Sequence, residues 1–432
     1  MSEIHRLGVR KAAARYVRAI APGILVALAG LEPDGAAAVT FTVTRADDQQ
    51  DSAPGDGLCS ALNGGGCSLR AAVQEANALS GADGIYLPPG TYSLTLAGAG
   101  EDFAASGDLD ITSAITLLGT GWAFTSVEMQ SFGDRIFDIQ GFSGLDLGDV
   151  TLSGGWVAGV GGGIYVRTGG GLAIRRSRIQ WCAAHHGGAI GTVGGSVMIE
   201  DTELAHDYVF ANPPTWFARG PAIAADEQAT VTVRRSSVHD NQYTDSGSAG
   251  GIDVWSSALS IESSSVVDNG APTTSINGAS SDLTIVSSTI GRMTVDGSAL
   301  PGASLSLGCS VVGYCTLTGG NVTYSSNGMN VFFDGTACVG INDVDGDWSL
   351  YPLWAPPDKF PARVPNSYSA ALEGGHPFVC APADQWSQAL RPFDSDGDGT
   401  PVLEVGAVEA IIVIFLDGFE IGSTAFWSAT VP

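Results

Sequence analysis

The sequence predicts an all-β solenoid, a parallel β-helix, because one short pattern recurs through the middle of the chain. Each copy has two apolar residues two positions apart, then a small hydroxyl residue, then a third apolar residue. Copies begin at residues 172, 197, 231, 259, 283 and 305, and an earlier copy at residue 145 lacks the hydroxyl. Successive copies start 27, 25, 34, 28, 24 and 22 residues apart, and repeats of this length are typical of solenoids.

The spacing within one copy predicts two short strands separated by a bend. Side chains of a strand point alternately to its two faces, so Leu172 and Ile174 share an inward face. Ser177 and Ile179 then face inward on the next strand. One copy cannot bury its own apolar face, so stacked copies are expected to share a continuous core. A leucine-rich repeat would instead show a fixed asparagine column.

The hydroxyl column has a structural and a catalytic interpretation. Stacked hydroxyls can satisfy each other or nearby backbone groups inside the solenoid. A catalytic nucleophile is needed once, not six times, so we predict an internal ladder. Its members are Ser177, Thr202, Ser236, Ser264, Ser288 and Ser310.

The composition fits this fold and excludes one class of partner. The chain has 432 residues, 59 of them glycine, and a formal net charge of −26. A surface this acidic repels phosphate backbones, so we expect no nucleic-acid partner. It favours cations, including calcium.

The first 38 residues resemble a secretory signal peptide. Basic residues end at Arg18, an apolar segment follows, and Ala36-Ala37-Ala38 supplies small residues for cleavage before Val39. The alternative is a short buried or membrane segment. No later stretch approaches the ~20 apolar residues of a membrane helix. We therefore expect a secreted or cell-surface protein without a membrane span after removal of the signal.

Seven cysteines fit an exported chain with disulfides. Cys59 and Cys67 flank a glycine-rich loop and are expected to pair, and Cys182 is expected to remain unpaired inside a coil. An alternative is that all seven are reduced thiols. Two further pairs are expected, Cys309 with Cys315 and Cys338 with Cys380.

The segment Cys67-Ser-Leu-Arg-Ala-Ala-Val-Gln-Glu-Ala-Asn77 resembles the CSLREA N-terminal domain, with Ala71-Ala72 where the family name has Glu-Ala. Phe41–Thr44 and Ile85–Tyr92 extend the resemblance, which covers about residues 39 to 320. It implies a secreted bacterial right-handed β-helix protein. Gly188-Ala189-Ile190 is also similar to repeats of polymorphic outer-membrane proteins, and the stretches 391–410 and 417–420 resemble C-terminal regions of exported proteins.

The CSLREA-like segment also predicts a short capping helix. Leu69, Ala72, Val73 and Ala76 form one apolar stripe at helical spacing. A helix over the first coil would cover an otherwise open solenoid end. We therefore divide the chain into a signal peptide (1–38), a cap with the first coil (39–115), the coils (116–320) and a C-terminal cap region (321–432).

Catalysis would need a specific set of side chains, because the β-helix fold alone does not choose between lyases, hydrolases and adhesins. Signatures of pectin-hydrolysing enzymes, which need paired carboxylates, are missing. The weak catalytic candidates are His206, His239, Asp240 and Asp253. Their alternative interpretation is solvated surface.

Asp394, Asp396 and Asp398 lie on a glycine-bearing turn and suggest a structural calcium loop. An EF-hand would need a glutamate at its twelfth position, where this chain has Val405. The alternative is an ordinary acidic turn.

The longest variable loop carries four aromatic residues that are candidates for stacking on sugar rings, Tyr208, Phe210, Trp216 and Phe217. Trp122, Trp156, Trp181 and Trp255 are further aromatics, some of them expected in the core. We therefore predict an adhesin-like binding or structural protein, with polysaccharide as the expected partner and no catalysis of its own. The alternative is a secreted polysaccharide lyase or glycoside hydrolase.

Overall fold

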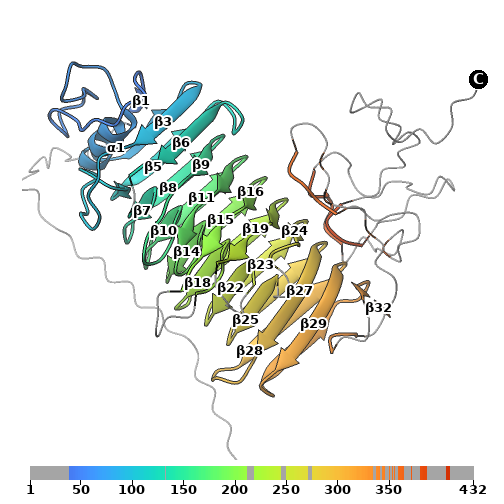
Figure 1. Cartoon of the computed structure of the whole chain (residues 1–432). Coiled ribbons are helices and arrows are strands. Elements are labelled where there is room, and N and C mark those ends of the chain that lie inside the picture. The colour runs from blue at the N-terminus through green and yellow to red at the C-terminus, as the bar shows by residue number, and fades with distance from the viewer. Residues whose placement is uncertain are drawn as a thin grey trace, which may run out of the picture. The chain divides into compact units, whose positions relative to one another are not determined.

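A computed structural model describes most of the chain after the leader. The described residues are 38–131, 133–211, 218–244, 250–270 and 275–333, with the C-terminal stretches 337–340, 343–345, 350, 353, 355, 359–363, 371, 380–386 and 405–408. They form a right-handed parallel β-helix with one short helix, α1 (Leu69–Ala78). All pairings between its strands are parallel, and successive coils stack along one axis (Figure 1).

Each coil contributes strands to three faces, which we name A, B and C in chain order. Face A is an 11-stranded sheet. Its strands are β1 (Thr40–Thr42), β2 (Ala82–Tyr86), β5 (Ala114–Leu118), β8 (Gly144–Gly148), β11 (Gly171–Arg175), β15 (Ser196–Glu200), β19 (Thr230–Arg234), β23 (Ala258–Glu262), β26 (Asp282–Val286), β28 (Ala303–Gly308) and β30 (Val322–Ser326).

Face B follows face A after a two-residue corner. Its strands are β3 (Gly90–Leu94), β6 (Thr125–Met129), β9 (Thr151–Ser153), β12 (Arg178–Gln180), β16 (Glu203–Ala205), β20 (Ser237–His239), β24 (Ser265–Val266), the first halves of β27 (Thr289–Asp296) and β29 (Val311–Thr318), β31 (Val331–Phe332) and β32 (Val344–Asp345).

Face C completes each coil. Its strands are β4 (Leu109–Ile111), β7 (Phe137–Ile139), β10 (Ile164–Val166), β14 (Ile190–Val193), β18 (Ile223–Asp226), β22 (Ile252–Trp255), β25 (Ile276–Ala279) and the second halves of β27 and β29, which join faces B and C into one sheet. Between faces B and C, three coils add a small sheet of β13 (Ala183–Ala184), β17 (Tyr208–Val209) and β21 (Gln242–Tyr243).

The predicted repeat is confirmed by the strand register on face A. Leu172 pairs with Val197, which pairs with Val231, and the column continues through the remaining copies. All six first positions are at most 3% exposed. Apolar side chains of successive coils thus stack directly on one another and form the continuous core that a single coil could not bury.

The predicted hydroxyl ladder is confirmed at the corner between faces A and B. The backbone N–H groups of Ser177, Thr202, Ser236, Ser264 and Ser288 each donate to the hydroxyl of the next coil at 3.1 to 3.4 Å. Each hydroxyl donates in turn to the carbonyl two residues before it. The ladder therefore satisfies corner N–H groups that the strands leave unpaired.

The residue just before each ladder hydroxyl forms an outward column, which we call the corner column. Its members have φ between 45° and 61°, in the left-handed region. This conformation turns the chain sharply from face A to face B and directs the corner side chain out of the core; Ser263, Ser287 and Cys309 are covered there by the later stretches of the chain. The column runs Asp149, Arg176, Asp201, Arg235, Ser263, Ser287 and Cys309.

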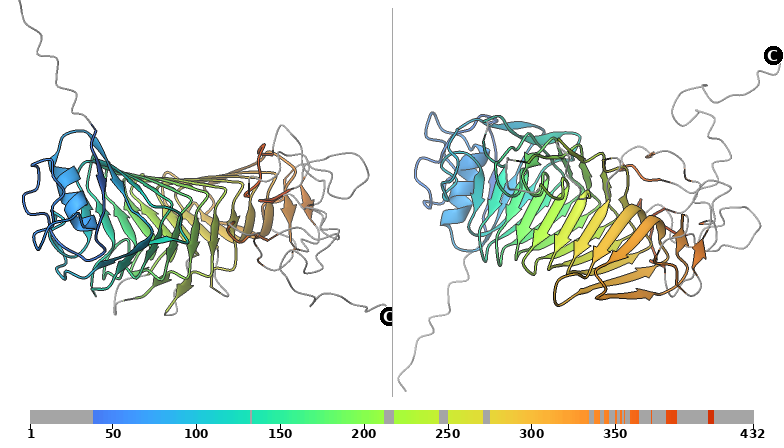
Figure 2. Two further views of the ribbon diagram at one scale, coloured as in Figure 1. Left: turned by 90° about the horizontal axis from the view of Figure 1, so that it is seen from above. Right: turned by 60° about the horizontal axis from the view of Figure 1, so that its bottom comes forward.

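The predicted capping helix forms at the N-terminal end of the stack, as Figure 2 shows. The Ser68 hydroxyl accepts the Ala71 N–H at 3.1 Å as an N-cap. The four stripe residues of the sequence analysis are buried against the first coils. Arg70 forms a buried ion pair with Asp48, which anchors the helix to the preceding segment.

The solenoid continues to β32, beyond the point where the sequence repeat fades near Val312. The described stretches that follow lie along the outer side of face B. The Ser237 hydroxyl donates to the Pro361 carbonyl at 2.5 Å, and the Thr289 hydroxyl accepts the Ala407 N–H at 3.1 Å. These stretches, 359–363, 380–386 and 405–408, are called the C-terminal strap below.

The disulfides correct part of the cysteine assignment. Cys59 pairs with Cys67 as expected, and Cys182 is free and buried. The expected Cys309–Cys315 and Cys338–Cys380 pairs are wrong, because the bonds are Cys309–Cys380 and Cys315–Cys338. Cys309 precedes strand β29 and Cys315 lies inside it, in an extended stretch where six residues span up to about 20 Å, far beyond the reach of a disulfide.

Candidate functional site

Three of the four candidate catalytic residues meet at the outer edge of face B. His239 Nδ1 lies 2.8 Å from Asp240 Oδ2, and its Nε2 lies 2.9 Å from Glu203 Oε1. The His206 ring packs edge-on against the His239 ring at 6.2 Å. The register explains the meeting, since Ala205 of β16 pairs with His239 of β20. Glu203, which also pairs with Arg178, was not among the sequence candidates.

This histidine cluster is buried and balanced in charge. Burial lowers the pKa of His239, but its hydrogen bonds to Asp240 and Glu203 outweigh that effect and raise the pKa to about 9. Burial raises the pKa of Glu203, yet His239 and Arg178 bring it below its usual value. His239 is therefore a cation at neutral pH and only 5% exposed. A protonated, enclosed imidazole is poorly suited to act as a general base.

The fourth candidate, Asp253, lies on another face. It belongs to β22 on face C, where its carboxylate lies 3.5 Å from Arg219 and accepts an Asn277 amide hydrogen at 3.0 Å. Burial raises its pKa to about 6. The structure thus separates Asp253 from the histidine cluster, and the single cleft considered from the sequence does not form.

Two of the four candidate aromatic residues, Tyr208 and Phe210, lie on or directly after β17 of the small sheet next to face B. Tyr208 is 6.1 Å from Trp181 between ring centroids, and Trp181 also stacks on His206 at 4.8 Å. Phe210 stacks on Trp156 at 4.9 Å with an interplanar angle of 3°. Trp216 and Phe217 lie outside the described residues.

Both ring stacks face the same side of the small sheet. Trp156, Ala183, Tyr208 and Gln242 form one row by register. Trp181 is 52% exposed and Trp156 is 39% exposed. Adjoining exposed aromatic rings, unlike a single exposed one, are a feature of binding surfaces. We call Trp156, Trp181, His206, Tyr208 and Phe210 the aromatic ridge.

A group that the sequence analysis missed is a buried cluster of aspartates on face C. Asp110 of β4 pairs in register with Asp138 of β7, and Asp108 precedes β4. One carboxylate oxygen from each of the three lies within 4.8 Å of the others, and all three side chains are buried. The signal was an apolar-Asp-apolar triplet at Leu109–Ile111, repeated at Phe137–Ile139 one coil later.

The acidic cluster carries more negative than positive charge. Asp134 joins it by accepting the Asp108 N–H at 3.1 Å. Arg135 and Arg167 both pair with Asp138, so four carboxyl groups face two guanidinium groups, and full ionisation would leave an excess of two negative charges. The excess is enclosed, because Asp134 is also buried.

Two carboxyl groups of the cluster, those of Asp108 and Asp110, resist ionisation. Burial and the neighbouring Asp134 and Asp110 raise the pKa of Asp108 to about 9, and burial raises the pKa of Asp110 to about 6. Asp108 Oδ1 is buried with no hydrogen-bond partner among the described residues. The three aspartates could therefore bind a metal ion, which would supply both the missing charge and the missing partner. The expected calcium loop at Asp394, Asp396 and Asp398 lies outside the described residues.

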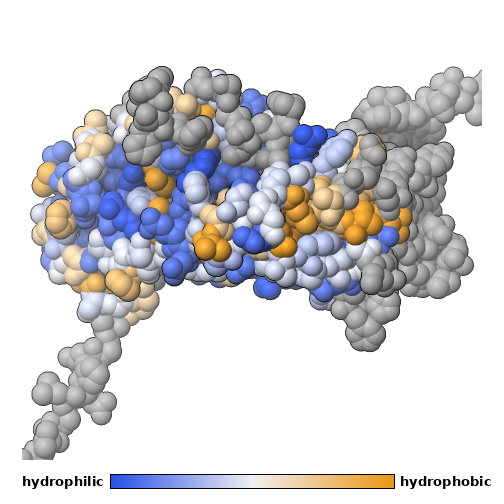
Figure 3. All heavy atoms as spheres, turned by 90° about the horizontal axis from the view of Figure 1, so that it is seen from below, coloured by the Kyte–Doolittle hydropathy of each residue, from blue (hydrophilic) through white to orange (hydrophobic). Residues whose placement is uncertain are grey.

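The molecular surface changes character along the solenoid. Figure 3 shows one face on which hydrophilic side chains gather over the N-terminal coils and apolar side chains become more frequent toward the C-terminal coils. Within the described residues, no helix is long and apolar enough to cross a membrane. Three disulfides indicate an extracellular or otherwise oxidising location.

Residues 162–343 match the family model of the right-handed β-helix region. Similar solved structures include ORF18 of Geobacillus virus E2, at 12% identity over 62% of this chain and 58% of that one, with a TM-score of 0.29. The catalytic domain of a GH87 alpha-1,3-glucanase in complex with nigerose matches at 11% identity, 61% and 67% coverage and a TM-score of 0.27.

The A-module of the Azotobacter vinelandii mannuronan C-5 epimerase AlgE6 matches at 16% identity, over 65% of this chain and 95% of that one, with a TM-score of 0.21. This chain thus spans 58% of the length of the viral protein. No curated protein matches the sequence. The strand register and the family model together establish a right-handed β-helix protein.

Proposed function

We propose that this protein is a secreted or cell-surface β-helix that binds polysaccharide through the aromatic ridge. The observation that carries the proposal is the pair of exposed ring stacks, Trp181 with His206 and Tyr208, and Trp156 with Phe210. Flat aromatic side chains bury apolar area at a small cost in side-chain entropy, and the Tyr208 hydroxyl can supply a polar contact at the edge of its ring. The apolar face of a sugar ring fits such a surface.

Export is supported by three independent features. The leader resembles a signal peptide, the Cys67–Asn77 segment resembles the CSLREA domain of secreted proteins, and three disulfides form. We propose no catalysis at the histidine cluster, because His239 is charged and enclosed.

A glycan-array screen on the chain from Val39, run with calcium and with chelator, tests binding and also records any released product. Trp181→Ala should weaken the affinity for a captured glycan about 30-fold, the equivalent of ~2 kcal/mol. The matched control is Trp255→Ala, which removes another half-exposed tryptophan, on face C. An equal loss of glycan affinity in both variants would contradict the assignment of the binding site to the aromatic ridge. Turnover of the glycan would contradict the proposal that the protein has no catalytic activity.

We further propose that the acidic cluster binds calcium, with a structural role. Carboxylate oxygens without nitrogen or sulfur ligands favour hard cations, and calcium tolerates irregular geometry. The Asp108 carbonyl and the Gly107 carbonyl both accept hydrogen bonds from Arg70, so the cluster adjoins the helical cap. A bound ion would fasten the loop before β4 to the first coils.

Calcium at about 100 times its Kd should raise the free energy of unfolding by about 2.7 kcal/mol. Asp110→Asn should remove this increase, because it deletes one charged ligand. Asp282→Asn, on an exposed position of face A, is the matched control and should keep it. Isothermal titration with calcium checks the same point without unfolding. An unchanged calcium response in Asp110→Asn would refute the site.

A further inference from the structure

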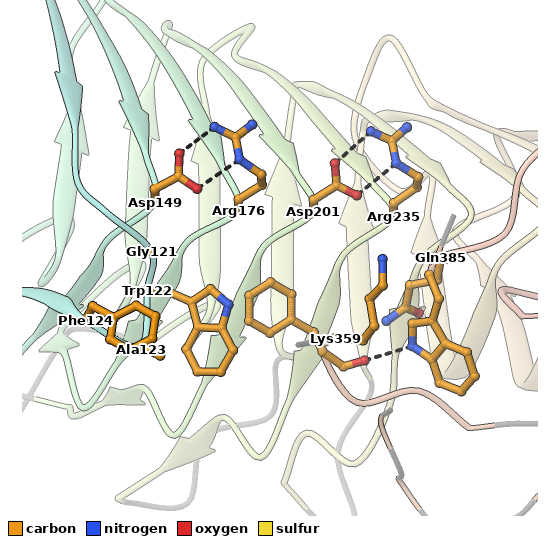
Figure 4. Close-up of a pocket in the computed structure, with 12 residues that line it drawn as sticks. Gly121, Trp122, Ala123, Phe124, Asp149, Arg176, Asp201, Arg235, Lys359 and Gln385 are labelled. Atoms are coloured by element: carbon orange, nitrogen blue, oxygen red, sulfur yellow. Dashed lines mark hydrogen bonds and ion pairs between the residues drawn. The ribbon is translucent and has the colours of Figure 1, made fainter. Parts of the chain in front are cut away.

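A hollow lies where the corner column meets the C-terminal strap, on the opposite edge of face B from the aromatic ridge. Its volume is about 430 Å³, within the range of roughly 300–1,000 Å³ of small-molecule sites. Two segments more than a hundred residues apart in sequence build it, so the strap completes the site. The lining residues drawn in Figure 4 come from loop 121–124, the corner column, and residues 359, 360, 385 and 386.

One wall is a row of ion pairs from the corner column. The Arg176 guanidinium donates two hydrogen bonds, of 2.9 and 2.6 Å, to the Asp149 carboxylate. Arg235 grips Asp201 through two of 2.9 Å and also contacts Glu200 at 2.5 Å. Figure 4 shows the two Asp–Arg pairs side by side along this wall. Each pair fixes its donors and acceptors in place, as hydroxyl-rich ligands require.

The other wall is aromatic. Trp122 lies 5.5 Å from Phe360 between ring centroids, and the Trp386 indole N–H donates to the Phe360 carbonyl at 3.0 Å. The Arg178 guanidinium lies 4.3 Å from the centroid of the Trp122 ring, and this cation–π contact fixes the position of the indole. The indole and phenyl rings are therefore held in position before any ligand arrives.

Lys359 supplies the hollow with an ammonium group. Figure 4 shows its ammonium group extended between the aromatic wall and the ion pairs. No carboxylate pairs with it among the described residues. The lining residues carry three cations (Arg176, Arg235, Lys359) and two anions (Asp149, Asp201). Asp149, Asp201 and Glu200 pair with the two arginines, so the ammonium group of Lys359 is the cation left for a ligand in a chain whose net charge is −26.

From this combination we infer that the hollow binds an anionic sugar. The ring lies against Trp122 and Phe360, its hydroxyls meet the fixed Asp–Arg pairs, and its carboxylate or sulfate pairs with Lys359. The inference rests on the proposed glycan-binding function for its ligand class. It adds a site distinct from the aromatic ridge and a requirement for negative charge on the ligand.

The test is titration calorimetry on the full chain with three probes: an oligogalacturonate, its methyl ester, and a sulfated galacto-oligosaccharide. Lys359→Met should weaken binding of the charged probes about tenfold, because one charge-assisted contact is lost. The methyl ester should bind the native protein and the variant equally weakly. Arg292→Gln, which removes a cation on face C, is the matched control and should change affinity less than twofold by the same reasoning.

A Lys359-dependent preference for either charged probe supports the inference, and the stronger probe identifies the anion. Unchanged affinity in Lys359→Met, or equal binding of ester and uronate to the native protein, overturns it. If Trp181→Ala weakens glycan binding while Lys359→Met does not, this inference fails and the aromatic ridge stands. If no glycan binds any form of the protein, both fail.

Discussion

The histidine cluster and the acidic cluster are both buried groups of ionisable side chains at outward positions of the solenoid, yet they differ in charge. In the first, Arg178 and His239 balance Glu203 and Asp240. In the second, Arg135 and Arg167 face four carboxyl groups, so full ionisation would leave two negative charges unbalanced. Burial alone therefore does not indicate a ligand site in this fold. Residual charge does, because an unpaired buried charge is unstable until something neutralises it.

The largest expected effect comes from unbalancing the histidine cluster. Glu203→Gln removes one carboxylate from the buried cation His239 and from the partly buried Arg178, and should lower the free energy of unfolding by about 3 kcal/mol. Chemical denaturation measures this change. Glu262→Gln, which breaks the half-exposed pair with Arg234, is the control and should cost less than about 1 kcal/mol. Similar losses in the two variants would show that the balance inside the cluster contributes little.

A pH series should separate the two clusters. Without metal, the pKa of Asp108 is about 9 in the folded protein against 3.8 for an ordinary aspartate, so the folded state retains a proton that the unfolded state releases. The free energy of unfolding should then fall as the pH rises from about 4 through about 9. Calcium displaces that proton, so its stabilising effect should grow over the same range.

Melting temperatures at about pH 5, 7 and 9, with calcium and with chelator, measure this difference. His239 also loses its contribution above its ordinary pKa of 6.5, as pH approaches about 9. Asp108→Asn removes only the effect of the acidic cluster and so separates the two. A calcium effect that stays constant with pH would argue against proton displacement.

The smallest expected effect is at the exposed side of the histidine cluster. Asp240 is 42% exposed, and Asp240→Asn should cost under about 1 kcal/mol. It should still lower the pKa of His239, because one of its two carboxylate partners is lost. Titration of the His239 ring by nuclear magnetic resonance follows this change. An unaltered pKa would mean that Glu203 alone holds the imidazole in its charged form.

The sequence was sufficient for the coils because their pattern is local. Leu172, Ile174, Ser177 and Ile179 specify two strands, a corner and a ladder position within eight residues. The capping stripe from Leu69 to Ala76 is equally local. Stacking then follows from the period alone, and the hydroxyl column agrees with it.

The candidate sites could not be predicted in the same way, because their residues meet partners that lie far away in the sequence. Asp110 and Asp138 are 28 residues apart, in coils that precede the first copy with a hydroxyl, so no column marked them. The path of the C-terminal strap over face B was not encoded in any repeat. For that reason Cys309 was assigned to nearby Cys315 and not to Cys380, 71 residues away. Asp253 was grouped with His239 because proximity in sequence does not reveal which face a strand joins.

The corner column has a consequence for how the surface of this protein can change over evolution. Neighbouring coils lie about 4.8 Å apart, so the column presents one side chain per step along the solenoid axis. The core pattern occupies other positions, and the left-handed corner accepts arginine, aspartate and serine alike. At the positions from Asp149 to Arg235, a substitution alters a single step of the surface and leaves the interior packing intact. New recognition properties can therefore arise one coil at a time on an unchanged scaffold.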